Sequence, residues 1–530
     1  MSHEFVWPFI FLSHECGRLH LCLCWYRVRA VNRPDPAFGP ASDAGHGAPT
    51  PLNSATFGAF GAPVAVPQYD RSAVRPGIVH IGVGGFHRAH LATYADELCE
   101  QGHRNWGIFG CGVMPGDSVM ADALGSQDGL YTMIVRGGDS TSLRVIGSII
   151  DYAHAHPDPS SVVEQIAHPD THIVSLTITE GGYPVDDNTG EYLADSPNAG
   201  AGSAFAIVAA GLEARRQQGG GPITVMSCDN ILSNGKVARS ATLGEAAHHG
   251  DDLIAWINAS VSFPNSMVDR ITPATSDNDR SWLLETHGIE DRWPVVTEPF
   301  RQWVIEDNFA GERLPLEELD IIVTHDVEPY EFMKLRLLNA GHSCMAYLSA
   351  LLGIATVDKA MAHASIDAYL ARFLHDEAKP VLPDVAGIDI DDYIATLVDR
   401  FRNPAIGDQI ARLCLDGTAK FPKFLLPTVR AQIAAGGAAP LSALALAGWC
   451  QYLLGVDELG NAIEISADPL LEDAIAHAKA SESDPAAFLR FAAVFDSDLA
   501  ESEAFTDAFT DALDLLRTKG TVAAIASISV

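Results

Sequence analysis

Short, continuously apolar runs alternate with helical patterns from about residue 76 to residue 227. Four of these runs have the length and composition of buried strands, at 77–84, 106–111, 171–179 and 223–227. Apolar residues at helical spacing lie between them, over 88–100 and over the alanine-rich stretch 204–217. Strands that alternate with helices in this way predict an α/β fold with a parallel sheet.

After about residue 325 the pattern becomes helical. Helices are predicted at 332–352, 391–401, 424–435, 441–454 and 505–516. The first 50 residues differ from both parts, because an apolar patch and a basic stretch run into a segment rich in Pro, Gly, Ala and Ser. We therefore predict a flexible extension at 1–50, an α/β domain at 51–325 and a mainly α-helical domain at 326–530.

The chain carries 68 acidic and 34 basic side chains, so its formal net charge is −34. Such a surface repels phosphate backbones and anionic lipids, which argues against nucleic-acid and membrane partners. No apolar run reaches the roughly 18 residues that span a bilayer. Nine cysteines, without a CxxC pair or a Cys/His cluster at zinc spacing, indicate free thiols in a reducing cytoplasm and no bound metal.

The first predicted strand ends in a glycine-rich turn that opens the next helix. This is the context of a dinucleotide-binding motif, in which Gly82 permits the tight turn and Gly84 lets the backbone approach a pyrophosphate. His87 stands where the third glycine of GxGxxG is expected, so a plain tight turn is the alternative. Asp117, after the next strand, is the candidate for binding the ribose hydroxyls, and its alternative is a turn aspartate after Pro-Gly.

A second constellation, Lys334, Asn339 and His342, lies at the start of the helical part. On a regular helix Lys334 and His342 are about 80° apart and Asn339 is a neighbour of His342, so all three can face one cleft. A lysine of lowered pKa can take the proton of an alcohol, and amide and imidazole groups can donate hydrogen bonds to the developing alkoxide. The alternative is an amphipathic helix with a solvated lysine and a core histidine.

These features lie within longer stretches that resemble the polyol-specific long-chain dehydrogenase family. The matching stretches run from about residue 51 to the C-terminus and are IVHIGVGGFHRAH, SLTITEGGY, TVMSCDN, SFPNSMVDRITP, WPVVTEPF, PYEFMKLRLLN and DGTAKFPKF. The resemblance implies an α/β N-terminal domain of Rossmann type, followed by a mainly α-helical C-terminal domain. It also implies a zinc-free, NAD-dependent enzyme with a lysine general base.

The resemblance further implies roles for individual residues. Lys334 falls at the general base, Glu331 at a carboxylate that gates proton traffic, and His342 at the group that positions the substrate. The other matched positions are Asn230 and Asn339 for an oxyanion site, Asp269, Arg412 and Lys420 for the polyol, and Gly82, Gly84, Phe86 and Asp117 for the cofactor. Gly116 stands where the family pattern has a second acid, which weakens the expectation of strict NAD preference.

We expect NAD-dependent oxidation of a sugar alcohol to a ketose, and the reverse. D-mannitol and D-fructose are the leading pair, and D-arabinitol and D-xylulose the second. The expected partner is this small molecule, and the enzyme a cytoplasmic monomer or small homo-oligomer. The alternative is an oxidoreductase of the same family for hexonates and hexuronates, since Arg270, Arg336 or Lys420 could hold a carboxylate. A catalytically inactive NAD-binding protein is the third hypothesis, disfavoured by the intact candidate residues.

Overall fold

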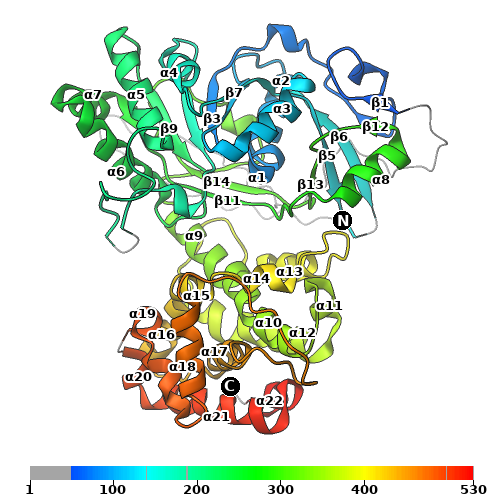
Figure 1. Cartoon of the computed structure of the whole chain (residues 1–530), viewed down its shortest axis with the longest axis vertical. Helices are drawn as coiled ribbons and strands as arrows, with labels where there is room; N and C mark the ends of the chain where they lie inside the picture. Colours follow the sequence, from blue (N-terminus) through cyan, green and yellow to red (C-terminus); the bar gives the residue numbers. More distant parts are fainter. Residues whose placement is uncertain (1–48, 139, 187–188, 497, 529–530) are drawn as a thin grey trace, which may run out of the picture. The chain divides into compact units, whose positions relative to one another are not determined.

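A computed structural model describes residues 49–138, 140–186, 189–496 and 498–528 (Figure 1). The extension expected at 1–50 lies outside the described residues except for its last two. Thr50 belongs to strand β1 (Thr50–Pro51), which pairs with β12 (Ile289–Glu290). Strand pairing in the described part thus begins at Thr50, the last residue of the expected extension.

The central sheet has six strands, all parallel, in the order β10-β9-β8-β3-β4-β7. The strands are β3 Ile78–Ile81, β4 Ile108–Gly112, β7 Ile149–His154, β8 Ile173–Leu176, β9 Ile223–Ser227 and β10 Val261–Ser262. The chain runs outward from β3 through β4 to β7, and then from β8 to β10 on the other side. This is the strand order of Rossmann folds, reversing between β3 and β8, and it confirms the predicted α/β class.

Helices cover both faces of this sheet (Figure 1). Ile78 of β3 packs in one apolar cluster with α2 (Leu91–Glu100), and the next residue, Val79, packs in another with α5 (Ala204–Gln217). This alternation follows from the period of two along a strand. The other helices of this part are α1 Gly85–Ala89, α3 Ser118–Ser126, α4 Ser160–Ala167, α6 Asn234–Ala246, α7 Asp251–Ser260 and α8 Asp277–His287.

Besides the β1/β12 pair, two further sheets were not predicted from the sequence. One has the order β13-β5-β6-β2 and includes the antiparallel pair β5/β6, and the other has the order β11-β14-β15. Their strands are β2 Val64–Ala65, β5 Tyr131–Arg136, β6 Thr141–Ile146, β11 Ser266–Asp269, β13 Val295–Thr297, β14 Gln302–Glu306 and β15 Ile322–Thr324. The second sheet matters for the site, because β11 ends at the candidate residue Asp269.

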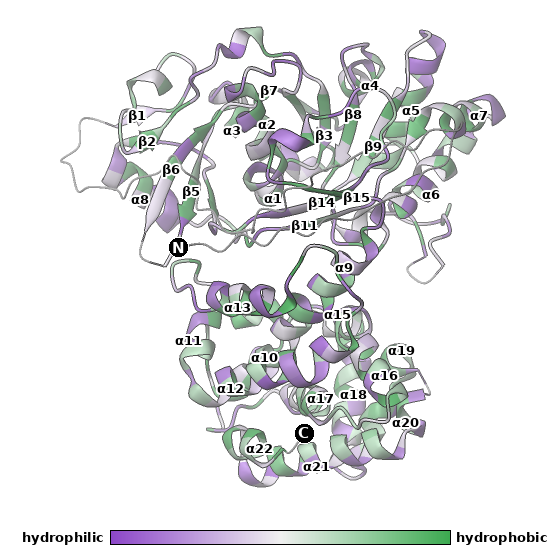
Figure 2. Ribbon diagram, turned by 180° about the vertical axis from the view of Figure 1, so that it is seen from behind, coloured by the Kyte–Doolittle hydropathy of each residue, from purple (hydrophilic) through white to green (hydrophobic). Residues whose placement is uncertain are grey.

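The part of the chain described after β15 is helical apart from isolated β-bridges, as predicted. Its α-helices are α9 Glu328–Lys334, α10 Ala340–Leu351, α11 Val357–Ala362, α12 Ala364–Arg372, α13 Ile390–Phe401, α14 Ile410–Leu413, α15 Gly417–Phe424, α16 Leu426–Ala434, α17 Pro440–Tyr452, α18 Leu471–Ala480, α19 Ala492–Phe495, α20 Asp498–Glu501, α21 Glu503–Lys519 and α22 Thr521–Ser527. Residues 441–450 of α17 are all buried, so this largely apolar helix forms the centre of the core (Figure 2). Among the described residues, no helix has the length and apolar character needed to cross a membrane.

Three predicted helices differ in detail. The helix expected over 88–100 is interrupted at His90, between α1 and α2. The helix expected over 424–435 begins only at Leu426, because α15 ends at Phe424. The helix expected over 332–352 begins at Glu328 and contains a π segment, so its assumed regularity was wrong.

Glu377 fixes the N-terminus of α17, where its buried carboxylate accepts hydrogen bonds from the Leu441 N–H (2.6 Å), the Ser442 N–H (2.8 Å) and the Ser442 hydroxyl (2.6 Å). Glu377→Ala leaves these buried donors without a partner. We expect it to lower the free energy of unfolding by about 2–4 kcal/mol, measured as a lower thermal midpoint by calorimetry. The exposed neighbour variant Asp376→Ala should change it by less than about 0.5 kcal/mol. Equal midpoints for the two variants would contradict the anchoring role.

Candidate active site

The glycine turn lies at the carboxyl end of the sheet, directly after β3. Gly82 has φ +93°, a conformation that favours glycine, and a Cβ there would lie 2.2 Å from the Thr177 carbonyl oxygen. At Gly84, a Cβ would meet nothing nearer than the Gly82 oxygen at 3.9 Å. Gly82 therefore shapes the turn, while the exposed Gly84 leaves its backbone open where the strand order reverses.

The other two cofactor candidates lie close to this turn in the fold. Asp117 ends a 3-10 turn (Pro115–Asp117) that follows β4, and its carboxylate accepts a hydrogen bond from the Met114 N–H at 2.9 Å. Phe86 stacks on His90, with the ring centroids 4.9 Å apart. An open glycine turn after the first strand and an acid after the second are the parts that hold a pyrophosphate and a ribose, so these residues fit a dinucleotide.

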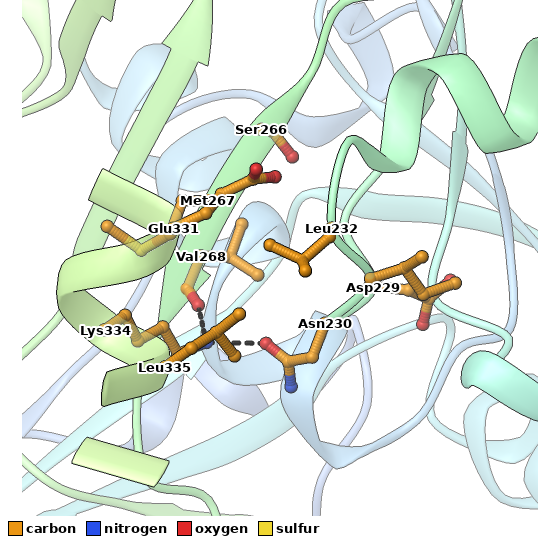
Figure 3. Close-up of a pocket in the computed structure, with 10 residues that line it drawn as sticks. Asp229, Asn230, Leu232, Ser266, Met267, Val268, Glu331, Lys334 and Leu335 are labelled. Atoms are coloured by element: carbon orange, nitrogen blue, oxygen red, sulfur yellow. Dashed lines mark hydrogen bonds between the residues drawn. The ribbon is translucent and has the colours of Figure 1, made fainter. Parts of the chain in front are cut away.

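Lys334 is the last residue of α9, and its side chain is buried. Its ammonium group donates hydrogen bonds to the Asn230 amide oxygen at 2.5 Å and to the Val268 carbonyl oxygen (Figure 3). Burial is the main cause that lowers the pKa of Lys334, the Asp269 carboxylate opposes it, and the Arg400 cation adds to it. A buried lysine of lowered pKa beside an amide has the properties of a general base.

The π segment between α9 and α10 (Leu335–Asn339) changes which residues share a face of the helix. Its closing N–H bonds to a carbonyl five residues earlier, which inserts one extra residue into the helix. On a regular helix Lys334 and Asn339 would be about 140° apart, and the insertion reduces this to about 40°. The separation of Lys334 and His342 falls from about 80° to about 20°. The segment therefore directs Lys334, Asn339 and His342 to one side of the helix.

His342 is buried and stacks on Phe401 of α13, with the ring centroids 4.1 Å apart. Burial lowers the pKa of His342 to about 3, so the imidazole is neutral at physiological pH. Its Nε2 atom has no hydrogen-bond partner among the described residues. A buried polar atom without a partner is costly, and a substrate hydroxyl group would satisfy it.

Asp269 is buried and bound by an arginine that the sequence did not identify. Both of its carboxylate oxygens accept hydrogen bonds from Arg400, at 2.8 and 3.0 Å. Arg400 also donates to both oxygens of Glu298, at 2.9 and 2.8 Å, and its guanidinium carbon lies 4.0 Å from the centre of the Phe300 ring. Asp269, Arg400 and Glu298, named here the carboxylate–arginine cluster, thus form one buried network.

The other residues expected to bind the polyol are less buried. Arg412 has a half-exposed side chain, and its Nε atom donates to Asp408 at 2.7 Å. Lys420 is partly buried, and its ammonium group lies 3.3 Å from the Leu413 carbonyl oxygen. Burial is the main cause that lowers the pKa of Lys420. The pairing of Arg412 with Asp408 was not predicted from the sequence, because no helix was expected there and Asp408 precedes α14 (Ile410–Leu413).

Two pockets open onto these residues. A pocket of about 280 Å³ is lined by Asn230, Lys334 and Glu331 (Figure 3), and one of about 230 Å³ by His342 and Arg400. The structure thus brings Lys334 and Asn230 together, but it places His342 in a different pocket from Lys334. Asn339 lines neither pocket.

Glu331 is buried one helical turn before Lys334, and its carboxylate accepts hydrogen bonds from the Ser233 N–H at 3.2 and 3.3 Å. Burial raises the pKa of Glu331 to about 7. This carboxyl group can therefore exchange protons near neutral pH. No group of three or more His, Cys, Asp or Glu side chains suited to a metal is found among the described residues.

Comparisons with known proteins agree with this geometry. Residues 76–318 match the model of the mannitol dehydrogenase Rossmann domain, and residues 326–517 match that of the mannitol dehydrogenase C-terminal domain. A mannitol 2-dehydrogenase of Pyrenophora tritici-repentis is 44% identical over 87% of this chain and 83% of the relative. A mannitol dehydrogenase of Saccharomyces cerevisiae is 40% identical over 90% of this chain and 97% of the relative.

Two solved structures of polyol dehydrogenases are also similar to this chain over most of its length. The mannitol 2-dehydrogenase of Pseudomonas fluorescens, in a ternary complex with NAD and D-mannitol, is 42% identical and has a TM-score of 0.81, covering 90% of this chain and 99% of that chain. A D-sorbitol dehydrogenase in substrate-free form is 34% identical, with a TM-score of 0.82 and coverage of 90% and 100%.

Gly82→Ala tests the glycine turn. The new Cβ would meet the Thr177 carbonyl oxygen in a conformation that costs about 1–3 kcal/mol for other residues. We expect NADH affinity, measured by fluorescence titration, to fall about tenfold or more while circular dichroism shows a folded protein. The control is Gly125→Ala in α3, where a Cβ meets nothing within 4 Å. Unchanged NADH affinity in Gly82→Ala would argue against dinucleotide binding at this turn.

Proposed function

Because the chain belongs to the mannitol dehydrogenase family, we propose that it oxidises D-mannitol to D-fructose with NAD and also runs the reverse reduction. The observation that carries the proposal is the buried Lys334 ammonium group, hydrogen-bonded to Asn230 beside a pocket. A polyol hydroxyl at this place would have a proton acceptor and an amide donor within reach. The Rossmann sheet with its open glycine turn supports the use of a dinucleotide.

The proposed chemistry balances one proton and one hydride. NAD, when bound, would supply the acceptor for the hydride released from C2 of the polyol. Neutral Lys334 takes the proton of the C2 hydroxyl, and in the reverse reaction the protonated lysine returns it to the ketose oxygen. Asn230 binds Lys334 through its amide oxygen, so its NH₂ group is left to donate to the developing alkoxide. Asn339 supplies a second donor from the same side of the helix.

The charges around the site favour a neutral polyol over a hexonate. Arg270 donates hydrogen bonds to two backbone carbonyl oxygens and Arg336 to one, and neither residue lines either of the two pockets. Arg412 is held by the Asp408 carboxylate. His342 presents a neutral imidazole, which suits a hydroxyl group better than a carboxylate. Lys420 is the one remaining cation of those considered for a hexonate.

The finer assignments are parts of the same proposal. The Asp117 carboxylate favours NAD, because it would repel the additional phosphate of NADP. Asp269, Arg412 and Lys420 bind the polyol, and Gly82, Gly84 and Phe86 help to bind the cofactor. Six buried free cysteines among the described residues support a reducing cytoplasm. The enzyme acts there as a monomer or small homo-oligomer without a catalytic metal.

Lys334→Ala tests the general base. We expect kcat for mannitol oxidation to fall about 100- to 10,000-fold with NADH affinity nearly unchanged, because only the proton acceptor is lost. Added primary amines should restore part of the rate, since a small amine fits the vacated space. Lys479→Ala, an exposed lysine of α18, is the matched control. If Lys334→Ala kept a rate within tenfold of wild type, Lys334 would not be the base.

A substrate panel tests the reaction itself. Absorbance at 340 nm, recorded with a chelator present, should show activity with NAD and mannitol, weaker or equal activity with arabinitol, and none with mannonate or altronate. The wavelength reports NADH formation directly. Activity on the hexonates alone would replace the proposal with hexuronate metabolism, and activity that is lost with chelator and restored by zinc would refute a metal-free mechanism.

A further inference from the structure

Arg400 occupies an unusual position for a cation. Its side chain is only 6% exposed and lies between two carboxylates, Asp269 and Glu298, that are 5% and 2% exposed. Arg400 comes from α13, Asp269 ends β11, and Glu298 follows β13. The backbone also holds Glu298, because the Ile271 N–H donates to its carboxylate. The carboxylate–arginine cluster is therefore held by several elements and is almost fully buried, with Arg400 at the edge of the second pocket.

The hydrogen bonds of Asp269 determine whether its carboxylate can form an ion pair with the neighbouring Lys334. Both carboxylate oxygens of Asp269 accept hydrogen bonds from Arg400, in a bidentate ion pair. Lys334 instead donates to two neutral oxygens, those of Asn230 and Val268. Val268 is the residue before Asp269 on β11, so the ammonium group and the carboxylate are close in the fold without being bonded to each other.

We propose that Arg400 is a positioning residue that keeps the Asp269 carboxylate from forming an ion pair with Lys334, and so keeps Lys334 available as a base. This inference rests on the proposed function only in taking Lys334 as the base. Without Arg400, a buried carboxylate would lie beside the lysine with no partner, and pairing with the ammonium group would be its best remaining option. That pairing would hold the proton on Lys334.

The charged groups around Lys334 together determine its pKa. The Asp269, Glu180 and Glu331 carboxylates raise the pKa of Lys334, and Arg400 lowers it. His90 interacts electrostatically with the same lysine and is neutral, because burial lowers the pKa of His90 to about 3. Removing Arg400 removes the cation and releases Asp269, and both effects raise the pKa of Lys334. Loss of Arg400 should therefore raise the pKa of Lys334.

The test is the pH dependence of Arg400→Met and Arg400→Lys. Mannitol oxidation needs neutral Lys334, so the pH at which kcat/KM rises should move upward by about 1 unit or more in Arg400→Met. Fructose reduction needs the protonated lysine, so its fall at high pH should move upward by the same amount. The pH profiles of Arg400→Lys should lie between those of Arg400→Met and wild type, because one ammonium group cannot form bidentate ion pairs with both carboxylates.

A control and a variant of opposite sign separate this role from a structural one. Arg144→Met breaks another buried ion pair, with Asp96, and should lower stability without moving either pH profile. Glu298→Gln removes one carboxylate and keeps Arg400, so both profiles should move to lower pH. If Arg400→Met fails to fold, the direction of the Glu298→Gln shift decides. Profiles within about 0.3 units of wild type in folded Arg400→Met or in Glu298→Gln would overturn the proposal.

Failure of this inference is distinguishable from failure of the proposed function. If Lys334→Ala retained the wild-type pH profile, the titrating group would not be Lys334 and the proposed function would be wrong. If Lys334→Ala abolished the profile and Arg400→Met left it in place, only the role of Arg400 would be wrong.

Discussion

A lysine that acts as a base has to be kept from water without being bound to a carboxylate, and the rest of the site depends on this constraint. Burial disfavours the charged form of Lys334, and its two hydrogen-bond partners are neutral oxygens. Asn230 follows a strand of the central sheet, Val268 belongs to the three-stranded sheet, and Lys334 ends a helix of the C-terminal part. The position proposed for proton transfer therefore depends on three separate elements that meet at one nitrogen atom.

The π segment after Lys334 changes which polar side chains share one side of the helix. On a regular helix, residues five and eight positions beyond a lysine lie about 140° and 80° from it, and one inserted residue reduces these separations to about 40° and 20°. Such a segment gives up regular i→i+4 hydrogen bonding, so it is kept where a particular alignment of side chains is needed. The Nε2 atom of His342 on the following helix is buried without a hydrogen-bond partner among the described residues, so it is free to bind a ligand group.

Sequence patterns predicted the elements whose apolar residues are consecutive. β3, β8 and β9 lie within the expected runs, and β4 extends one residue beyond its run, since strands covered on both faces are apolar throughout. The β5/β6 hairpin was missed although apolar runs flank Gly137-Gly138, a signal that was available. Arg400 could not have been found, because its partner Asp269 is 131 residues away and nothing local distinguishes it from other arginines. Long-range ion pairs are set by the tertiary fold, which periodicity does not report.

Stability alone does not explain a buried carboxylate–arginine cluster, since apolar residues of similar volume would often be equally or more stable. Its charges do make sense for catalysis on a neutral substrate. With one guanidinium and two carboxylates, the cluster carries a net charge of about −1, and a protonated Lys334 brings the local total to about zero. A hexonate bound beside neutral Lys334 would raise the buried negative charge to about −2, whereas mannitol leaves it unchanged. The electrostatic arrangement that keeps the lysine available therefore also disfavours carboxylate-bearing substrates.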